Sequence, residues 1–184
     1  MLQTHFSPFP ELATDRLMLR RIADDDTDDL FLLRCDKRVM EYIDRPLAQT
    51  PADAAKLIRL IDDNLTAGNG ISWAITLKGE TPLVGTIGLW RFMKEDYRAE
   101  IGYLLHPDLQ GRGLMQEALA AVLGYGFSTI RLHSVEANVN PGNAASIRLL
   151  EKSGFVREAY FRENYYFNGV FKDTAIYSLL TPDR

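Results

Sequence analysis

The sequence predicts a mixed α/β domain built around one sheet. Its 184 residues are 46% hydrophobic and 25% charged, a composition that provides one full hydrophobic core. Runs in which apolar and polar residues alternate, as in strands, are interleaved with segments of helical spacing. No repeat, low-complexity tract or long linker divides the chain. We therefore expect a single domain over residues 1–184.

The first half of the chain predicts one strand, two helices and a meander. Residues 14–22 alternate as a strand does, and the aspartates that open residues 23–43 suit the positive end of a helix. We interpret those aspartates as helix capping, because the run lacks the glycine and ligand spacing of a calcium loop. A second helix is expected over 51–66, with Pro51 at its start. Three strands should follow, at 72–78, 82–93 and 97–107.

The second half predicts a helix, a strand, a helix and a long hairpin. The helices are expected to about residue 127 and over 143–154, where Gly154 stops the second one. A strand over 132–139 separates them. The terminal segment 155–181 should turn at Asn168-Gly169, a dipeptide typical of two-residue hairpin turns.

Charge and cysteine content exclude several classes of function. The formal net charge of −4 argues against a general nucleic-acid binder, so we expect no direct nucleic-acid partner. A single cysteine, Cys35, forms no internal disulfide and suits a reducing compartment. The N-terminus does not resemble a signal peptide, and no apolar run approaches the roughly 18 residues of a membrane span. A cytoplasmic protein without membrane contact is expected.

The stretch "LQGRGLMQEALAAVLGYGF", residues 109–127, places two glycines directly before a helix. Gly111 and Gly113 let the backbone approach a ligand closely, and the first amides of a helix lack partners within it. This arrangement predicts an anion-binding site, and a pyrophosphate is a suitable ligand for it. A dinucleotide fingerprint would need glycine at Gln116, and no P-loop lysine follows. A tight turn that binds nothing remains an alternative.

A second polar group lies where the 132–139 strand meets the following helix. Asn138, Asn140, Asn143 and Ser146 occupy this junction. Asn143 is a good N-cap for the helix, and that capping role is compatible with a role toward a ligand. Asn138 is less easily explained by structure alone, because it lies at the end of a strand in which apolar residues otherwise alternate.

These two motifs resemble those of the GNAT superfamily of N-acetyltransferases. Its Q/R-x-x-G-x-G/A signature corresponds to residues 110–115, "QGRGLM", where Met115 replaces the usual glycine or alanine. The segments "LATDRLMLRRI" and "RENYYFNGVFKDTAIYSLL" are similar to the ribosomal-protein N-terminal acetyltransferases of the Rim type. The resemblance implies an acyltransferase with the GNAT acyl-CoA N-acyltransferase fold, a twisted and mostly antiparallel central sheet flanked by helices.

The resemblance also implies acetyl-coenzyme A (acetyl-CoA) as cosubstrate and no metal. Backbone amides would bind its pyrophosphate, a strand edge would pair with its pantetheine arm, and polar side chains would contact it from the neighbouring strand and helix. The implied residues are, in that order, Gln110, Gly111, Arg112, Gly113, Leu114 and Met115; Tyr103, Leu104 and Leu105; and Asn138, Asn143 and Ser146.

Direct transfer to an amine requires two proton movements. Glu100 is our candidate base, although a strand glutamate in an ordinary salt bridge is equally consistent with the sequence. Ser146 is the candidate donor to the departing thiolate, with Tyr160, Tyr165 and Tyr166 as competitors. Some Rim-type enzymes carry an acid where this chain has Tyr165, which leaves the base open.

Three functions remain compatible with the sequence. The first is acetylation of the N-terminal α-amine of a protein, with ribosomal proteins as candidates. The second is acetylation of a small amine such as an amino sugar, a polyamine or an amino acid; the acidic net charge would attract a cationic acceptor. The third is a non-catalytic module that binds coenzyme A. A homodimer is compatible with the sequence, which does not require one.

Overall fold

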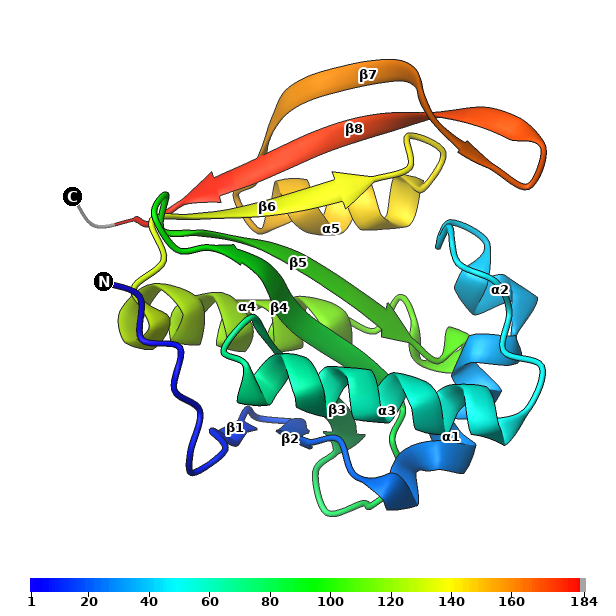
Figure 1. Cartoon of the computed structure of the whole chain (residues 1–184), viewed down its shortest axis with the longest axis vertical. Coiled ribbons are helices and arrows are strands. Elements are labelled where there is room, and N and C mark those ends of the chain that lie inside the picture. Colours follow the sequence, from blue (N-terminus) through cyan, green and yellow to red (C-terminus); the bar gives the residue numbers. More distant parts are fainter. Residues whose placement is uncertain (183–184) are drawn as a thin grey trace.

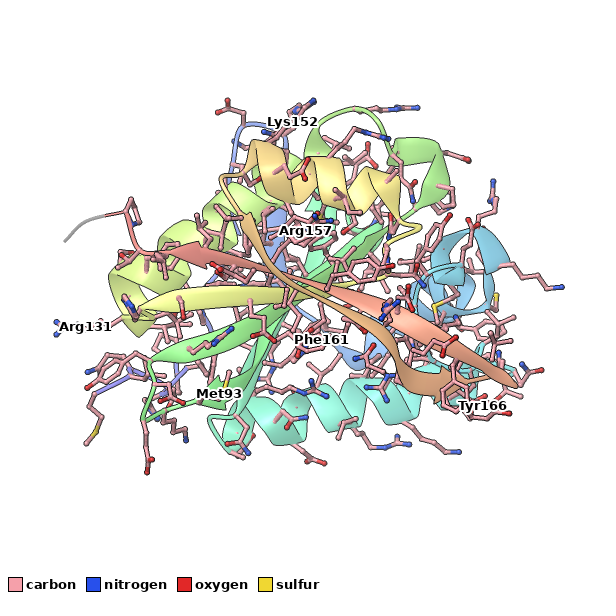
Figure 2. All side chains as sticks on the ribbon, turned by 90° about the horizontal axis from the view of Figure 1, so that it is seen from above. Met93, Arg131, Lys152, Arg157, Phe161 and Tyr166 are labelled. Carbon is pink, nitrogen blue, oxygen red and sulfur yellow. The ribbon has the colours of Figure 1, made fainter. Side chains whose placement is uncertain are left out.

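A computed structural model describes residues 1–182 as an eight-stranded sheet covered by helices on both faces (Figures 1 and 2). The strand order is β1-β2-β3-β4-β5-β6-β8-β7. The strands are β1 (Leu12–Ala13), β2 (Leu17–Arg21), β3 (Gly70–Leu77), β4 (Gly85–Met93), β5 (Arg98–Leu105), β6 (Ser134–Val139), β7 (Val156–Phe167) and β8 (Val170–Leu180). The helices are α1 (Thr27–Cys35), α2 (Lys37–Met40), α3 (Pro51–Thr66), α4 (Leu114–Tyr125) and α5 (Ala144–Lys152).

The sheet is antiparallel except where β5 meets β6. These two strands run parallel and pair at only three positions, from Arg98 opposite Ser134 to Glu100 opposite Glu136. Beyond Glu100 they separate, as Figure 1 shows at the centre of the molecule. The predicted mixed α/β fold with a mostly antiparallel sheet is confirmed. The separation leaves the last part of β5 without a neighbour on its β6 side.

Two hydrophobic clusters attach the helices to the sheet. The larger one joins α4 to the sheet and contains Trp73, which is fully buried and donates a hydrogen bond from Nε1 to the carbonyl of Pro10 at 2.7 Å. The smaller one joins α1, α2 and α3 around Leu30 and Ile58. Helices α4 and α5 therefore lie on one face of the sheet and α3 on the other, as Figure 2 shows.

The predicted helix over 23–43 is interrupted in the structure. A 3₁₀ turn over Asp24–Asp26 leads into α1, and the chain becomes extended at Asp36 before α2 begins. The Asp36 carboxylate accepts a hydrogen bond from the Arg38 amide at 2.8 Å, so it caps α2 as a new helix. The strong capping tendency of aspartate explains the break, which helical periodicity alone did not reveal.

The terminal hairpin has the predicted turn. Asn168 and Gly169 both have positive φ, 50° and 83°, as a two-residue turn with the native twist requires. Three irregularities bend this hairpin and the meander: the pairing of β7 with β8 shifts between Phe161 and Tyr165 and also between Arg157 and Ala159, and that of β4 with β5 shifts between Trp90 and Met93. The first shift directs the tip of the hairpin toward the loop after α2 (Figure 1).

Candidate active site

The glycine turn connects β5 to α4 with two left-handed residues. After β5 ends at Leu105 and a 3₁₀ turn covers Pro107–Leu109, Gly111 and Gly113 adopt φ of +74° and +77°. Only glycine adopts this conformation without a Cβ penalty. Helix α4 begins at Leu114, and no side chain in residues 1–182 caps its first turn. Its leading amides therefore remain available to an anion.

A hydrogen-bonded clamp of Thr14, Arg16 and Glu117 holds this turn against the start of β2. The Glu117 carboxylate accepts from Thr14 Oγ1 at 2.5 Å, from the Arg16 amide at 2.8 Å and from Arg16 Nε at 2.7 Å. Arg16 Nη1 then donates to the carbonyl of Arg112, inside the turn, at 2.9 Å. The hydroxyl of Thr14, followed by the bonds from Arg16, lowers the pKa of Glu117 below its usual range.

The remaining members of the predicted phosphate motif have distinct positions. Gln110 is exposed, and its Nε2 donates to the Leu105 carbonyl at 3.1 Å, which ties the turn to the end of β5. Arg112 is exposed. Leu114 is buried and Met115 packs partly buried against the main core. The Met115 side chain therefore points into the protein, and its size is accommodated by the core.

A cleft of about 1030 Å³ opens where β5 separates from β6. It reaches from the end of β5 across to α1 and α3, and to the tip of the hairpin. The predicted site residues that line it are Glu100, Tyr103, Leu104, Asn138, Asn143, Ser146 and Tyr165. The turn over 110–115 does not line this cleft but follows directly from the strand that does.

Tyr103 and Ser146 form a pair across the cleft. Their hydroxyl oxygens lie 2.8 Å apart, one on β5 and the other in the first turn of α5. The Ser146 amide also donates to the Asn143 side chain at 3.0 Å, so Asn143 is the N-cap of α5 as predicted. Burial raises the pKa of Tyr103 to about 12. Tyr103 is thus protonated at neutral pH and able to donate to Ser146.

Glu100 lies on β5 at the last position where β5 pairs with β6. Its Oε2 accepts a hydrogen bond from Arg91 Nη1 at 2.9 Å, and no bond to Oε1 is found within residues 1–182. The neighbouring Glu136 binds Arg98 and accepts from Asn138 Nδ2 at 2.9 Å. The exposed Asn138 amide is therefore attached to a carboxylate on its own strand.

Tyr165 binds a carboxylate that the sequence analysis did not identify. Its hydroxyl donates to Asp44, in the loop between α2 and α3, and Lys172 of β8 binds the other oxygen of the same carboxylate. Burial and the Asp44 charge raise the pKa of Tyr165 well above its usual range. These contacts connect the tip of the hairpin to the opposite wall of the cleft. Asp44 stands in an irregular segment with no periodic or motif signal that would have marked it.

Trp90 covers the floor of the cleft. A Cβ placed on Gly102 would lie only 2.1 Å from Cη2 of Trp90, so the indole occupies the space that a side chain at residue 102 would fill. Both residues line the cleft. This placement gives Trp90 a surface in the cleft.

The acetyltransferase (GNAT) domain family matches residues 16–156, about three quarters of the chain. The chain belongs to this GNAT family. It is 36% identical over 174 residues to the uncharacterized N-acetyltransferase YoaA of Bacillus subtilis (strain 168), which covers 95% of this chain and 98% of YoaA.

Rim-type enzymes are among the relatives of this GNAT protein. It is 27% identical over 181 residues to the ribosomal protein uS5-alanine N-acetyltransferase of Escherichia coli (strain K12), across 96% of this chain and 93% of that one. A solved structure of RimL, the ribosomal L7/L12 alpha-N-protein acetyltransferase, in complex with coenzyme A has the same fold. Its TM-score is 0.85 at 18% identity, across 93% of this chain and 98% of that one. The predicted family, its Rim-type resemblance and the acyltransferase class are confirmed.

Two further observations concern metal ligands and membrane spans in the part of the chain that the structure describes. Within residues 1–182, no three His, Cys, Asp or Glu side chains lie close enough together to hold a metal ion. The same residues include no helix with the length and apolarity of a membrane span.

Proposed function

We propose that this GNAT enzyme transfers the acetyl group of acetyl-CoA to the N-terminal α-amine of a protein, by direct attack in a ternary complex. The observation that carries the proposal is the position of two unsatisfied backbone surfaces. The free edge of β5 beyond Glu100 is followed, after the 3₁₀ turn over Pro107–Leu109, by the uncapped amides at the start of α4. An extended amide-containing arm with a pyrophosphate at its end fits both surfaces at once.

In the proposed site, backbone groups and polar side chains bind the cofactor, and an ion pair holds the glycine turn in place. The amides of Gln110 to Met115 would bind the pyrophosphate, and the clamp of Arg16 and Glu117 would keep the turn in its left-handed conformation. The edge over Tyr103 to Leu105 would pair with the pantetheine amides. Asn138, Asn143 and Ser146 would face the same arm from the other side of the cleft. The thioester supplies an activated acetyl carbon.

The chemistry requires an unprotonated amine. An α-amine has an unperturbed pKa near 8, so weak assistance is sufficient at neutral pH. We assign Glu100 as the base, acting through water on its Oε1 side, because Arg91 occupies only Oε2. As the amine nitrogen bonds to the acetyl carbon, the proton passes to this carboxylate and the C–S bond breaks.

The departing thiolate needs a hydrogen-bond donor. Ser146 is suited to this role because its hydroxyl is paired with that of Tyr103, and burial keeps Tyr103 protonated. When Ser146 donates to sulfur, Tyr103 donates to Ser146, so the hydroxyl oxygen of Ser146 stays satisfied. Tyr165 is a less suitable donor, because its proton is held by Asp44.

The acceptor proposal is supported by the uS5-alanine N-acetyltransferase relative, whose chain aligns with almost the whole of this one. The test is release of coenzyme A thiol from acetyl-CoA with peptides that carry the N-termini of ribosomal proteins. Mass spectrometry should find the acetyl group on the α-amine. The protein-substrate proposal fails if a broad peptide panel shows no turnover while small amines are acetylated.

Matched variants test the residue assignments. Glu100→Gln should lower kcat because it removes the proposed base, and Ser146→Ala should lower kcat because it removes the proposed hydrogen-bond donor to the departing thiolate. Glu136→Gln is a suitable control for Glu100→Gln, because Glu136 lies opposite it on β6 and is held by Arg98. If Glu100→Gln and Ser146→Ala together leave the rate unchanged, these two assignments are wrong and the enzyme class still stands.

A further inference from the structure

The charges that line the cleft do not balance. Asp44 and Glu100 are its carboxylates, and Arg34, Arg45 and Arg91 are its arginines. Both carboxylates are already paired, Asp44 with Lys172 from β8 and Glu100 with Arg91. No ion pair within residues 1–182 involves Arg34 or Arg45, and neither guanidinium donates a hydrogen bond there. Two positive charges therefore face the cleft without a counter-charge.

This pair is electrostatically unfavourable in the protein alone. Arg34 is half-buried in α1, and its burial, together with repulsion from Arg45, lowers the pKa of its guanidinium below the usual value. Arg45 is exposed, so only the Arg34 guanidinium is partly removed from water; each of the two groups has five N–H donors and no acceptor. An oxyanion placed between two such forks would relieve the repulsion and accept several of these donors at once.

The arginine pair belongs to α1 and the loop after α2, whereas the Tyr103–Ser146 pair belongs to β5 and α5. Arg45 directly follows Asp44, the residue that binds Tyr165, and the Arg34 carbonyl accepts a hydrogen bond from the Ala48 amide at 3.1 Å. The loop after α2 is therefore fastened at one end to the hairpin and at the other to α1. This arrangement holds both arginines at the cleft.

We propose that Arg34 and Arg45 form a subsite for an anionic group, a carboxylate or a phosphate, that the acceptor amine carries. The inference rests on the proposed function, in that the acceptor is taken to occupy this cleft. It reverses the expectation from net charge: the chain is acidic overall, but the local charges of the cleft select against a purely cationic acceptor such as a polyamine.

Calorimetry with matched peptides tests the subsite without requiring turnover. The protein is saturated with coenzyme A, which has no acetyl group to transfer, and titrated with alanyl-aspartyl-glycinamide and with its asparaginyl counterpart. We expect the acidic peptide to bind about tenfold more tightly, as charge-assisted bonds to arginine imply. This preference should shrink as salt is raised, because the site is open to solvent. The proposal is overturned if neither this acidic peptide nor the two anionic probes described below bind more tightly than their neutral partners.

Two variants and one control separate the arginine pair from a general charge effect. Arg34→Gln and Arg45→Gln should each reduce the preference for the acidic peptide and leave the affinity for the asparaginyl peptide within about twofold. Arg59→Gln removes an exposed arginine of α3 that does not line the cleft, and it should leave the preference intact. If Arg59→Gln reduces the preference as much as the other two, the subsite does not exist.

Two further probes identify the source of the anion. Alanyl-phosphoseryl-glycinamide, compared with alanyl-seryl-glycinamide, tests whether the subsite accepts a phosphate. Alanine, compared with alaninamide, tests whether it accepts the carboxylate of a small amino acid. Tighter binding of either anionic probe than of its neutral partner supports the subsite. Turnover of peptides with no preference for an acidic group would refute the subsite and leave N-terminal acetylation standing. A preference in binding without peptide turnover would refute N-terminal acetylation and leave the subsite standing.

Discussion

The left-handed glycine at position 111 gives the most direct test of the proposed phosphate turn. Gly111 has φ of +74°, and a Cβ added there meets no heavy atom of residues 1–182 within 4 Å. Gly79, in the turn between β3 and β4, has φ of +86° and equally open surroundings. Gly111→Ala and Gly79→Ala therefore impose the same backbone penalty, one in the proposed site and one outside it.

The penalty has two parts that the pair of variants separates. An alanine in the left-handed region costs about 1–2 kcal/mol, partly offset because alanine restricts the unfolded chain. We expect each variant to lower the free energy of unfolding by about 1 kcal/mol. In Gly111→Ala alone, the turn should also misplace an amide that bonds to phosphate, and a hydrogen bond to a charged group contributes about 1.5–3 kcal/mol. Its affinity for coenzyme A should therefore fall at least about tenfold.

Urea unfolding measures the first part and calorimetric titration with coenzyme A the second. Gly79→Ala should match the wild-type dissociation constant for coenzyme A, although its stability falls. The proposed role of the turn is refuted if the two variants bind coenzyme A equally well despite similar losses of stability.

Three other predictions follow from the contacts described. Glu117→Gln should raise the KM for acetyl-CoA severalfold with little change in kcat, because the clamp to Arg16 acts on the turn. The pKa of Glu117 is lowered in the folded protein, so its carboxylate stabilises the fold above about pH 4.5. In urea unfolding, the difference in stability between wild type and variant should therefore disappear as the pH is lowered. Tyr103 has its pKa raised to about 12, so it lowers the stability of the wild type as pH rises from 10 toward 12. Tyr103→Phe should lose less stability over this range, although Tyr165, whose pKa is also raised, still contributes a loss; parallel alkaline unfolding curves would contradict this. Gly102→Ala should displace the indole of Trp90, changing tryptophan emission and raising the KM for the acceptor, and an unchanged spectrum would show that the two groups are not in contact.

Features set by local sequence could be predicted well. The alternation of β3 to β6, the start of α3 at Pro51, the Asn143 cap and the Asn168-Gly169 turn all follow from neighbouring residues. The glycine turn was also predictable, because a positive φ next to a helix start has a local sequence signal. The single-domain assignment and the individual roles of the site residues stay predictions.

Features set by distant partners could not be predicted. Glu117 meets Arg16 across 101 positions of sequence, and Tyr165 meets Asp44 across 121. Neither partner lies in a periodic pattern or motif that would connect it to the other. The excess of positive charge at Arg34 and Arg45 could not be predicted for the same reason, since it depends on which carboxylates form ion pairs with other residues. Charge summed over the whole chain does not reveal such a local excess.

Because β5 and β6 separate after Glu100, the central sheet is open along the last part of β5. Inside the molecule, beyond Glu100, a row of peptide groups is held ready by strands on one side and left open on the other. A ligand that pairs with all of these peptide groups would be extended and rich in amides, as we propose for the pantetheine arm. Inhibitors of this protein should therefore be designed as extended peptide mimics, because a flat aromatic compound would leave those peptide groups without hydrogen-bond partners.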